Sequence, residues 1–387
     1  MGLPSGSPMG IEIKFAQGIH LFGPHGEKYT DLVSGVSVSN VGHRHPEVIT
    51  AIQEQLDHYL HLMVYGEMIQ TPQVKLAEAI CNLLPAQLRA IYFVNSGSEA
   101  IEGALKLAKR YTHRSEIVSF QNAYHGGTQG ALSIMGKEEL KNAFRPLLPD
   151  TRLLEFNNID ELDKITERTA CVVVETIQAE AGIILPEDGF LESLHKRCRE
   201  TGALFVLDDI QMGFARTGKV FSFEHFGCVP DILCLAKGMG GGMPIGAFIS
   251  SKEIMNSLTF KPELGHITTF GGHPVCCAAA LASLRIILKH NLSEGALKKG
   301  QLFAKLLEEH PLVKEIRYVG LMMAVELSHP EKMTLLREKL LEAGLIVDQF
   351  LFNHNAFRIA PPLIISEDQV RNISESIISC MDEVYFE

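Results

Sequence analysis

Residues 233–250, LCLAKGMGGGMPIGAFIS, give the clearest single indication of the fold. A short apolar run ends at Lys237, a glycine-rich turn follows, and a second apolar run begins near Gly246. A lysine at the end of a buried strand is unfavourable unless a partner takes up its charge or its amine reacts. Taken alone, Lys237 is better explained as a surface lysine whose stem packs on apolar neighbours, so its meaning depends on the rest of the chain.

The same pattern of short apolar runs continues over much of the chain. Between about residues 48 and 285, the runs AIYFV, EIVSF, ACVVVET, ALFVLDD, ILCLA and GAFIS alternate with helical stretches such as EAIEGALKLAKRY and FLESLHKRCRETG. This alternation predicts an α/β fold in which helices cover a mainly parallel sheet.

The pattern divides the chain into three expected parts. Residues 1–47 alternate apolar and polar side chains around a GPHG turn, which predicts strands that pack with a smaller domain. Residues 48–285 form the large domain. After HNLSEG the chain reads as helix, strand, helix, strand, helix, so residues 286–387 are expected to form a small α+β domain.

Composition limits the possible functions. The 387 residues are 46% hydrophobic and carry a net charge of -11, which argues against a nucleic-acid surface because phosphates need a basic face. No apolar run is long enough to cross a bilayer, and the N-terminus lacks the pattern of a secretory signal. The eight cysteines form no C-x-x-C pair, so we expect reduced thiols in a cytoplasmic protein and no metal site.

Ligands of open α/β sheets bind beyond the carboxyl ends of the strands, so polar residues there are candidates for a site. In FVNSGSEAIEGALKLAKRY, residues 93–111, a strand is followed by a small polar turn and an amphipathic helix. Gly97 and Ser98 lie at the start of this helix, where free backbone N–H groups attract a phosphate. An ordinary serine-capped helix is the alternative.

A second strand end occurs in ALFVLDDIQMGFARTG, residues 203–218. Asp208 and Asp209 follow an apolar run, so at least one carboxylate is expected to be buried. A buried carboxylate needs a partner, and a protonated ring nitrogen would serve. A helix or turn cap explains the pair equally well.

Two glycine patterns are misleading. Residues 213–220, GFARTGKV, nearly match the phosphate loop G-x-x-x-x-G-K-[ST], but Val220 stands where a metal-ligating hydroxyl is required. A P-loop nucleotide-binding protein is therefore a distant alternative. The glycines that follow Lys237 fail the dinucleotide fingerprint G-x-G-x-x-G and are better explained by close approach to a bulky ligand or by a sharp turn.

In FQNAYHGGTQGALS, residues 120–133, Tyr124 follows a strand and could stack on a flat ring, although a core aromatic is the commoner role. The combination is more specific than its parts. A phosphate-binding helix start, a stacking aromatic, a carboxylate for a ring nitrogen and an imine-forming lysine together complement pyridoxal phosphate. In this combination Lys237 would be held as a Schiff base.

With these motifs in place, the chain from about residue 11 onward resembles the class III (ω-amino acid) pyridoxal-phosphate aminotransferases of fold type I. FVLDDIQMGFARTG resembles the family's D-E-[IV]-Q-x-G-x-x-R-T-G, with Asp209 in place of the usual glutamate. DILCLAKGMGGGMPIGA matches the lysine signature, and HITTFGGHPVCCAAALA resembles H-G-[ST]-T-[FY]-G-G-N-P. FRIAPPLIIS is similar to the C-terminal R-x-x-P-P-L segment.

The resemblance implies a role for each matching residue that would contact the cofactor. Lys237 would bind pyridoxal phosphate covalently and later move the proton, and Asp208 would pair with the ring nitrogen. The remaining contacts would be made near the phenolic oxygen by Gln211, on the ring face by Tyr124, and at the phosphate by Gly97 and Ser98.

The resemblance also implies residues that bind substrate or a second subunit. Thr269 resembles a threonine that reaches the phosphate of the neighbouring subunit, which implies a homodimer with shared active sites. Arg358 matches an arginine that binds a substrate carboxylate. Glu180 matches a glutamate that masks this arginine while the ω-amine is bound, and the acceptor's carboxylate would then displace it.

We therefore expect an aminotransferase that moves the amino group of an ω-amino acid or amine, similar to acetylornithine or ornithine, to a 2-oxo acid such as 2-oxoglutarate. Two departures leave the donor open: Gly127 stands where a carboxylate-binding arginine is usual, and Val36 replaces an ornithine-type tyrosine. Tyr65 and Arg44 are conceivable substitutes. The alternatives are an aminomutase of the glutamate-semialdehyde type and a catalytically silent relative.

Overall fold

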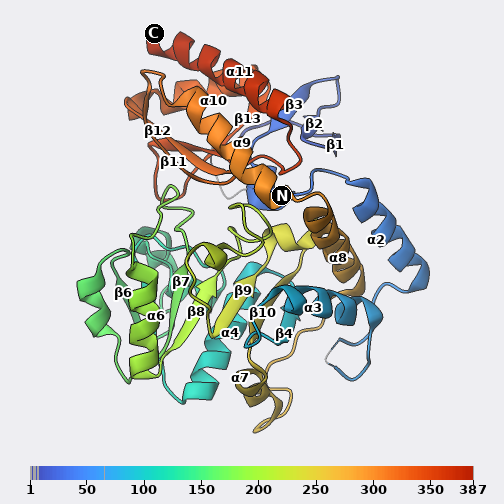
Figure 1. The fold of residues 1–387 in the computed structure, drawn as a ribbon, viewed down its shortest axis with the longest axis vertical. Helices are drawn as coiled ribbons and strands as arrows, with labels where there is room; N and C mark the ends of the chain where they lie inside the picture. The colour runs from blue at the N-terminus through green and yellow to red at the C-terminus, as the bar shows by residue number, and fades with distance from the viewer. Residues whose placement is uncertain (1, 3–5, 7, 65, 387) are drawn as a thin grey trace.

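The computed structural model describes residues 2, 6, 8–64 and 66–386, and a seven-stranded sheet is its largest element (Figure 1). The strand order is β4-β10-β9-β8-β7-β5-β6. β10 is antiparallel to both of its neighbours, whereas the pairs from β9 to β6 are parallel, as the sequence predicts. The strands are β4 (Ala90–Val94), β5 (Glu116–Phe120), β6 (Thr151–Leu154), β7 (Thr169–Glu175), β8 (Leu204–Asp208), β9 (Ile232–Leu235) and β10 (Gly246–Ser250).

Alternate residues of the central strands face two separate apolar cores. On β8, Phe205 and Leu207 belong to one core, and Leu204 and Val206 belong to the other. Both faces are covered by helices, so these strands are apolar throughout instead of alternating with polar residues. One core contains residues of α4 (Gly97–Thr112) and α7 (Lys252–Asn256), and the other contains residues of α2 (Pro46–His58), α3 (Thr71–Leu83), α6 (Phe190–Thr201) and α8 (Pro274–Lys289).

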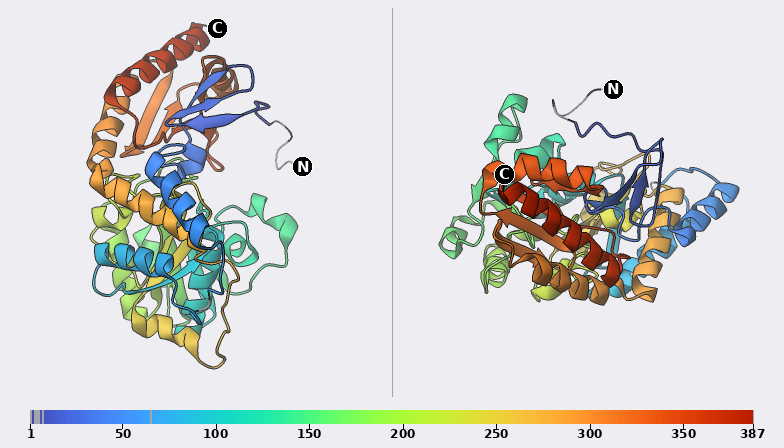
Figure 2. Two further views of the ribbon diagram at one scale, coloured as in Figure 1. Left: turned by 90° about the vertical axis from the view of Figure 1, so that its right-hand side faces the viewer. Right: turned by 90° about the horizontal axis from the view of Figure 1, so that it is seen from above.

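Two four-stranded sheets form the upper part of the molecule in Figure 1. The first has the order β1-β2-β3-β13, in which β13 pairs in parallel with β3, so the two ends of the chain share one sheet (Figure 2). The second has the order β11-β12-β15-β14. Their strands are β1 (Phe15–Gln17), β2 (His20–Phe22), β3 (Lys28–Asp31), β11 (Val313–Val319), β12 (Met322–Leu327), β13 (Leu345–Ile346), β14 (Asp348–Gln349) and β15 (Ala356–Ile359).

Helices complete the upper part and short turns connect the remaining elements. We propose that the chain divides into residues 1–47, 48–285 and 286–387. The pairing of β3 with β13 supports the packing of the first part against the third. The other helices are α1 (Ser34–Ser37), α5 (Gln129–Ser133), α9 (Leu292–Leu307), α10 (Met333–Glu342) and α11 (Glu367–Phe386). The 3-10 turns are η1 (Glu138–Leu140), η2 (Asn142–Phe144), η3 (Ile159–Lys164), η4 (Ser222–His225), η5 (Lys237–Gly240), η6 (Ser257–Thr259) and η7 (Pro330–Lys332).

One buried arginine joins all three parts of the chain. Nη1 of Arg216 donates hydrogen bonds to the carbonyls of Leu321 at 2.9 Å and Pro361 at 2.6 Å, and Nη2 donates to Oδ1 of Asn40 at 2.5 Å. Asn40 in turn donates to the carbonyl of Phe214 at 2.8 Å. A buried guanidinium needs such acceptors, so these bonds hold the upper sheets against the loop after β8.

The eight cysteines are all buried and none is in a disulfide. In the described part of the chain no single helix has the length and apolar character to span a bilayer, and only the bent pair α8 and α9 meets these criteria together. No cluster of three or more His, Cys, Asp or Glu side chains within the described residues is arranged to hold a metal ion.

Candidate active site

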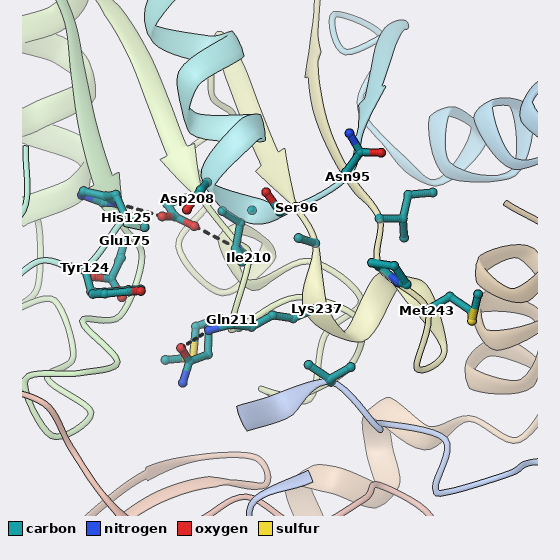
Figure 3. Close-up of a pocket in the computed structure, with 18 of the residues that line it drawn as sticks. Asn95, Ser96, Tyr124, His125, Glu175, Asp208, Ile210, Gln211, Lys237 and Met243 are labelled. Carbon is teal, nitrogen blue, oxygen red and sulfur yellow. Dashed lines mark hydrogen bonds and ion pairs between the residues drawn. The ribbon is translucent and has the colours of Figure 1, made fainter. Parts of the chain in front are cut away.

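A cavity of about 430 Å³ lies at the carboxyl ends of β7, β8 and β9 (Figure 3). Strand β8 brings Asp208 to its wall, and the turns after β5 and β9 bring Tyr124 and Lys237. Six of the nine site residues expected from the sequence line this cavity, namely Gly97, Ser98, Tyr124, Asp208, Gln211 and Lys237. The parallel strands bring them together because their carboxyl ends share one edge of the sheet.

Lys237 follows β9 directly and begins η5. Its backbone has a φ of 45°, an uncommon value for a residue with a side chain, and the surrounding chain must hold it there. Nζ donates a hydrogen bond to Oε1 of Gln211. Burial lowers the pKa of Lys237, which increases the fraction of neutral amine available to react.

Asp208 is held in the cavity by hydrogen bonds to both of its carboxylate oxygens. Oδ2 lies 2.7 Å from Nδ1 of His125, and Oδ1 accepts a hydrogen bond from the N–H of Ile210 at 3.1 Å. Nε2 of His125 lies 3.1 Å from Oγ of Ser119, so the imidazole is itself fixed in position. The arrangement presents an oriented carboxylate that can pair with a protonated ring nitrogen.

Asp209 has a different environment although it is the next residue. Its carboxylate accepts hydrogen bonds from the N–H of Ser222 at 2.9 Å and from the hydroxyl of the same residue. Complete burial raises the pKa of Asp209 to about 7. This carboxylate therefore holds the start of η4, and it does not line the cavity.

The start of α4 closes one end of the cavity. Ser96 is the N-cap of the helix, and its Oγ accepts a hydrogen bond from the N–H of Glu99 at 3.2 Å. The first turn nevertheless remains available to bind an anion. Oγ of Ser98 accepts from the N–H of Gly127 at 3.1 Å. Gly126 has a φ of 129°, and a Cβ there would lie 2.0 Å from Oγ of Ser98, so only glycine permits this close approach.

The residues fit pyridoxal phosphate on the chemistry of their side chains and backbone. One cavity contains a helix start suited to a phosphate, a fixed carboxylate suited to a pyridinium nitrogen, and an amine of lowered pKa suited to an aldehyde. Tyr124 lines the same cavity and is half-buried. Its N–H donates to Oε1 of Glu175 at 3.0 Å.

Glu180 and Arg358 lie beside the cavity and bind each other, although 178 positions separate them. Nη2 of Arg358 is 2.8 Å from Oε1 and 2.9 Å from Oε2 of Glu180. Nε and Nη1 of Arg358 have no hydrogen-bond partner among the described residues, although Nη1 is 3.6 Å from a carboxylate oxygen of Asp348. The buried guanidinium is thus only partly satisfied.

Other expected residues lie outside this cluster. Thr269 is exposed and does not line the cavity of its own chain. Gly127 is also exposed, and a Cβ added there would meet nothing within 4 Å. Val36 is half-buried and Arg44 is exposed. Tyr65 lies outside the described residues.

Two titratable residues that line the cavity, His125 and Glu175, have no role assigned from the sequence. His125 directly follows Tyr124 in the sequence, and its imidazole contacts Asp208. Glu175 ends the apolar run ACVVVE just as Asp208 ends ALFVLD. A carboxylate at the end of an apolar run is thus a sequence signal that the two residues share.

The stretch at 213–220 does not form a phosphate loop. The N–H groups of Phe214 and Gly218 donate to the carbonyls of Val220 and Ala215, at 2.7 Å and 3.1 Å. Lys219 is exposed, and the next element is the four-residue turn η4 instead of an α-helix. Its backbone donors are thus used within the loop, which argues against the nucleotide-binding alternative.

The fold and this cavity define a pyridoxal-phosphate enzyme, and comparison with known proteins identifies the class. Residues 3–381 match the family described as aminotransferase class-III. An acetylornithine aminotransferase of Methanopyrus kandleri is 38% identical over 358 residues, which cover 92% of this chain and 90% of that protein. An acetylornithine aminotransferase of Methanocaldococcus jannaschii is 36% identical over 382 residues, which cover 96% of this chain and 92% of that protein.

Solved structures agree with this result. A transaminase from the marine bacterium Virgibacillus superposes with a TM-score of 0.93 at 28% identity, covering 99% of this chain and 96% of that chain. An ornithine aminotransferase from Toxoplasma gondii superposes with a TM-score of 0.92 at 28% identity, covering 99% and 93%. The chain therefore belongs to the class III aminotransferases, and it is a transaminase that depends on pyridoxal phosphate.

Proposed function

We propose that the protein transfers the amino group of an ω-amino acid or amine, similar to acetylornithine or ornithine, to a 2-oxo acid, with 2-oxoglutarate as the expected acceptor. The observation that carries the proposal is the buried pair of Glu180 and Arg358 beside the cavity of Lys237. A buried arginine that is only partly satisfied suits a substrate carboxylate, and a neighbouring glutamate can neutralise it between substrates.

Each residue of the cavity has a distinct task in this proposal. When bound, pyridoxal phosphate withdraws electrons from the carbon that carries the amino group. Asp208, oriented by His125, holds the proton on the ring nitrogen. Lys237 binds the cofactor, and its Nζ moves the proton at the substrate carbon. The first turn of α4 with Gly97 and Ser98 binds the phosphate, Tyr124 packs on the ring, and Gln211 lies near its phenolic oxygen.

Glu180 would act as a switch between the two substrates. With the amine bound, Glu180 covers Arg358, because an unpaired guanidinium in a closed pocket is unfavourable. With the oxo acid bound, the substrate carboxylate takes the place of Glu180 and forms a bidentate pair. Gln211 supports this exchange, since its Nε2 lies 3.5 Å from Oε1 of Glu180 while its Oε1 binds Lys237.

The donor is proposed to lack a carboxylate that binds near residue 127. Gly127 has no side chain there, and the space around it is open. A bidentate carboxylate contact is worth about 1.5 to 3 kcal/mol, so its loss disfavours acetylornithine relative to a plain ω-amine.

We also propose a homodimer. Exposed apolar side chains cluster on residues 60–64, 66–69 and 260–270; for example, Ile69 is 93% exposed and Phe270 is 54% exposed. The two segments adjoin, with the rings of His61 and Phe270 4.9 Å apart. A large apolar surface of this kind suits a second copy of the chain, and Thr269 would reach the partner's phosphate from it. The eight buried, unpaired thiols support a cytoplasmic location.

The test is a pair of half-reactions followed by absorbance. Donor amines should change the visible band of the bound cofactor, and 2-oxoglutarate should restore it. Glu180→Ala should slow the half-reactions unequally, because it leaves Arg358 without its partner only while the amine is bound. If Glu180→Ala leaves the rates of both half-reactions and their ratio the same as in the unaltered enzyme, the switch is rejected. Turnover of an amine without any oxo acid would indicate an aminomutase instead.

A further inference from the structure

Glu175 is a second carboxylate in the cavity that the proposed function does not use. It ends β7 as Asp208 ends β8, and the two residues are partners in register on these parallel strands. The residue is only 5% exposed, and no ion pair within the described part of the chain neutralises it. A buried carboxylate without a cation is unfavourable, so its retention needs a structural or functional reason.

Each oxygen of Glu175 accepts a hydrogen bond from a different loop. Oε1 accepts from the N–H of Tyr124, in the loop after β5, at 3.0 Å. Oε2 accepts from the N–H of Ala179, in the turn after β7, at 3.0 Å. Ala179 directly precedes Glu180. The carboxylate of Glu175 therefore fixes the backbone of Tyr124 and the backbone directly before Glu180.

Further bonds make the two loops a single unit. Nε2 of Gln178 donates to the carbonyl of Gln121 at 2.7 Å, which links the same pair of loops a second time. The backbone groups of Gln178 and Ile184 exchange two hydrogen bonds of 3.0 Å, so the turn that contains Glu180 is closed at its base. A shift of either loop is thus transmitted to the other.

We propose that Glu175 is a positioning residue that couples the Tyr124 loop to the Glu180 turn, so that cofactor placement and the masking of Arg358 depend on one carboxylate. Glu175 acts through the backbone of these loops and does not touch the reacting atoms. The part that concerns Arg358 rests on the proposed function, whereas the part that concerns cofactor placement does not.

Protonation should weaken this coupling. Burial raises the pKa of Glu175 to about 7, an effect that His125 opposes and Asp208 reinforces. Lys237 faces the same group from η5, and Glu180 is the next carboxylate along the turn. A protonated carboxyl presents an O–H on one oxygen, so it no longer accepts fully from both loops. The coupling is therefore complete well above pH 7, falls to about half near pH 7 and is lost well below it.

The experiment compares Glu175→Gln with Glu116→Gln in the holoenzyme. Glutamine accepts through one oxygen and turns an NH₂ group toward the other backbone N–H, so one loop loses its anchor. Glu116 is a matched control, because it is also 5% exposed and accepts two hydrogen bonds, but it lies at the opposite end of the sheet. Because a buried acceptor is lost, the affinity of Glu175→Gln for pyridoxal phosphate should fall about tenfold or more, as measured by equilibrium dialysis.

Three further readouts separate positioning from a general loss of stability. Amide hydrogen exchange should quicken in residues 121–128 and 176–184 of Glu175→Gln and stay unchanged there in Glu116→Gln. The ratio of the two half-reaction rates should change about tenfold, and the double variant with Glu180→Ala should keep the ratio of Glu180→Ala alone. Because protonation weakens the coupling, the rate of the oxo-acid half-reaction should rise as the pH increases through 7, and this rise should be absent in Glu175→Gln.

The proposal is overturned if Glu175→Gln matches the unaltered enzyme in cofactor retention, in amide exchange of both segments and in the rate ratio. It is equally overturned if Glu116→Gln changes these three properties to the same extent. Glu175→Asp, which keeps the charge on a shorter stem, should give intermediate values and replaces the glutamine variant if that protein does not fold. Should no amine and oxo acid react at all, the proposed function fails, while dialysis and amide exchange still decide the role of Glu175.

Discussion

The two ends of the seven-stranded sheet both bury charged groups, but only one end supplies all of their partners. At the amino ends of the strands, Glu116 accepts hydrogen bonds from Thr169 Oγ1 at 2.6 Å and from Arg152 Nη2 at 3.0 Å. Nearby, Nη1 of Arg114 donates to the carbonyls of Thr169 and Thr201 at 3.1 Å and 2.8 Å. The hydrogen-bonding groups at this end therefore find their partners within the chain.

At the carboxyl ends, the charged groups face a cavity instead. Asp208, Glu175 and Lys237 line it, and burial alters the pKa of both Glu175 and Lys237. Buried groups with perturbed pKa values and incomplete partners are typical of functional sites, because a ligand completes them. Substitutions at this end should therefore alter binding and rate, whereas those at the amino end should alter stability.

The largest contrast is expected for lysines. Lys237→Ala should lower the rate of transamination about 10⁴-fold or more, because in the proposed function Lys237 is both the nucleophile and the proton carrier. Borohydride reduction of the unaltered enzyme, followed by peptide mass spectrometry, should find the reduced cofactor on Lys237. Lys141→Met is the control, since Lys141 is also buried with a lowered pKa but donates to the carbonyl of Met135 at 2.7 Å. Absence of this adduct from the unaltered enzyme saturated with pyridoxal phosphate would contradict the assignment.

The second largest contrast is expected between the adjacent carboxylates Asp208 and Asp209, whose substitutions should affect different properties. Asp208→Asn should reduce kcat about 10²- to 10³-fold, because an oriented charge at the cofactor is lost while the shape is kept. Asp209→Asn should leave kcat within a few-fold and instead lower the free energy of unfolding by about 1–3 kcal/mol, since an amide cannot accept both bonds from Ser222. Steady-state kinetics and urea unfolding of both variants measure the two effects, and equal losses of kcat would remove the distinction.

Adjacent glycines should differ in the same way. Gly126→Ala places a Cβ 2.0 Å from Oγ of Ser98 at a φ of 129°, so cofactor affinity should fall about 10- to 100-fold, for a strain of about 1–3 kcal/mol. Gly127→Ala meets open space and should change affinity less than about twofold. Titration of each apoenzyme with pyridoxal phosphate gives the comparison. A similar loss in both variants would show that the loop does not pack on Ser98 as described.

The pH dependence of stability tests burial at Asp209. Its pKa is raised from 3.8 to about 7, so its stabilising contribution is complete below about pH 4 and is lost as the pH rises through 7. The free energy of unfolding of the unaltered apoenzyme, minus that of Asp209→Asn, should fall by about 4 kcal/mol over this range. Histidines of lowered pKa act in the opposite direction but cancel in the difference. A difference that grows with pH would mean that the ionised carboxylate is the favoured form.

The smallest effect is expected at the amino end. Arg152 is 46% exposed, so its bond to Glu116 is partly screened by solvent. Arg152→Ala should cost about 1 kcal/mol or less in the free energy of unfolding and leave both half-reactions unchanged. Thermal unfolding and the half-reaction assay check this. A slower half-reaction would show that the two ends of the sheet are coupled.

Much of the site was predictable because it depends on local order along the chain. An apolar run followed by a polar residue locates Asp208 and Lys237 at strand ends, and parallel strands bring such ends to one edge. The confirmed α/β fold and the class III family follow from the same runs and motifs. The sequence pattern alone did not decide between Asp208 and Asp209, because consecutive side chains of a strand point to opposite sides and the pattern does not say which side is the cavity.

The sequence by itself therefore determined the alternation of strands and helices, the strand ends that carry charged residues, and the helix start suited to a phosphate. Only the tertiary structure decided that Glu175 joins two loops, that His125 holds Asp208, and that Glu180 meets Arg358 across 178 positions. The physical reason is that propensity and periodicity act over a few residues, whereas a buried charge is satisfied by whatever partner the packing of distant segments brings within hydrogen-bond distance.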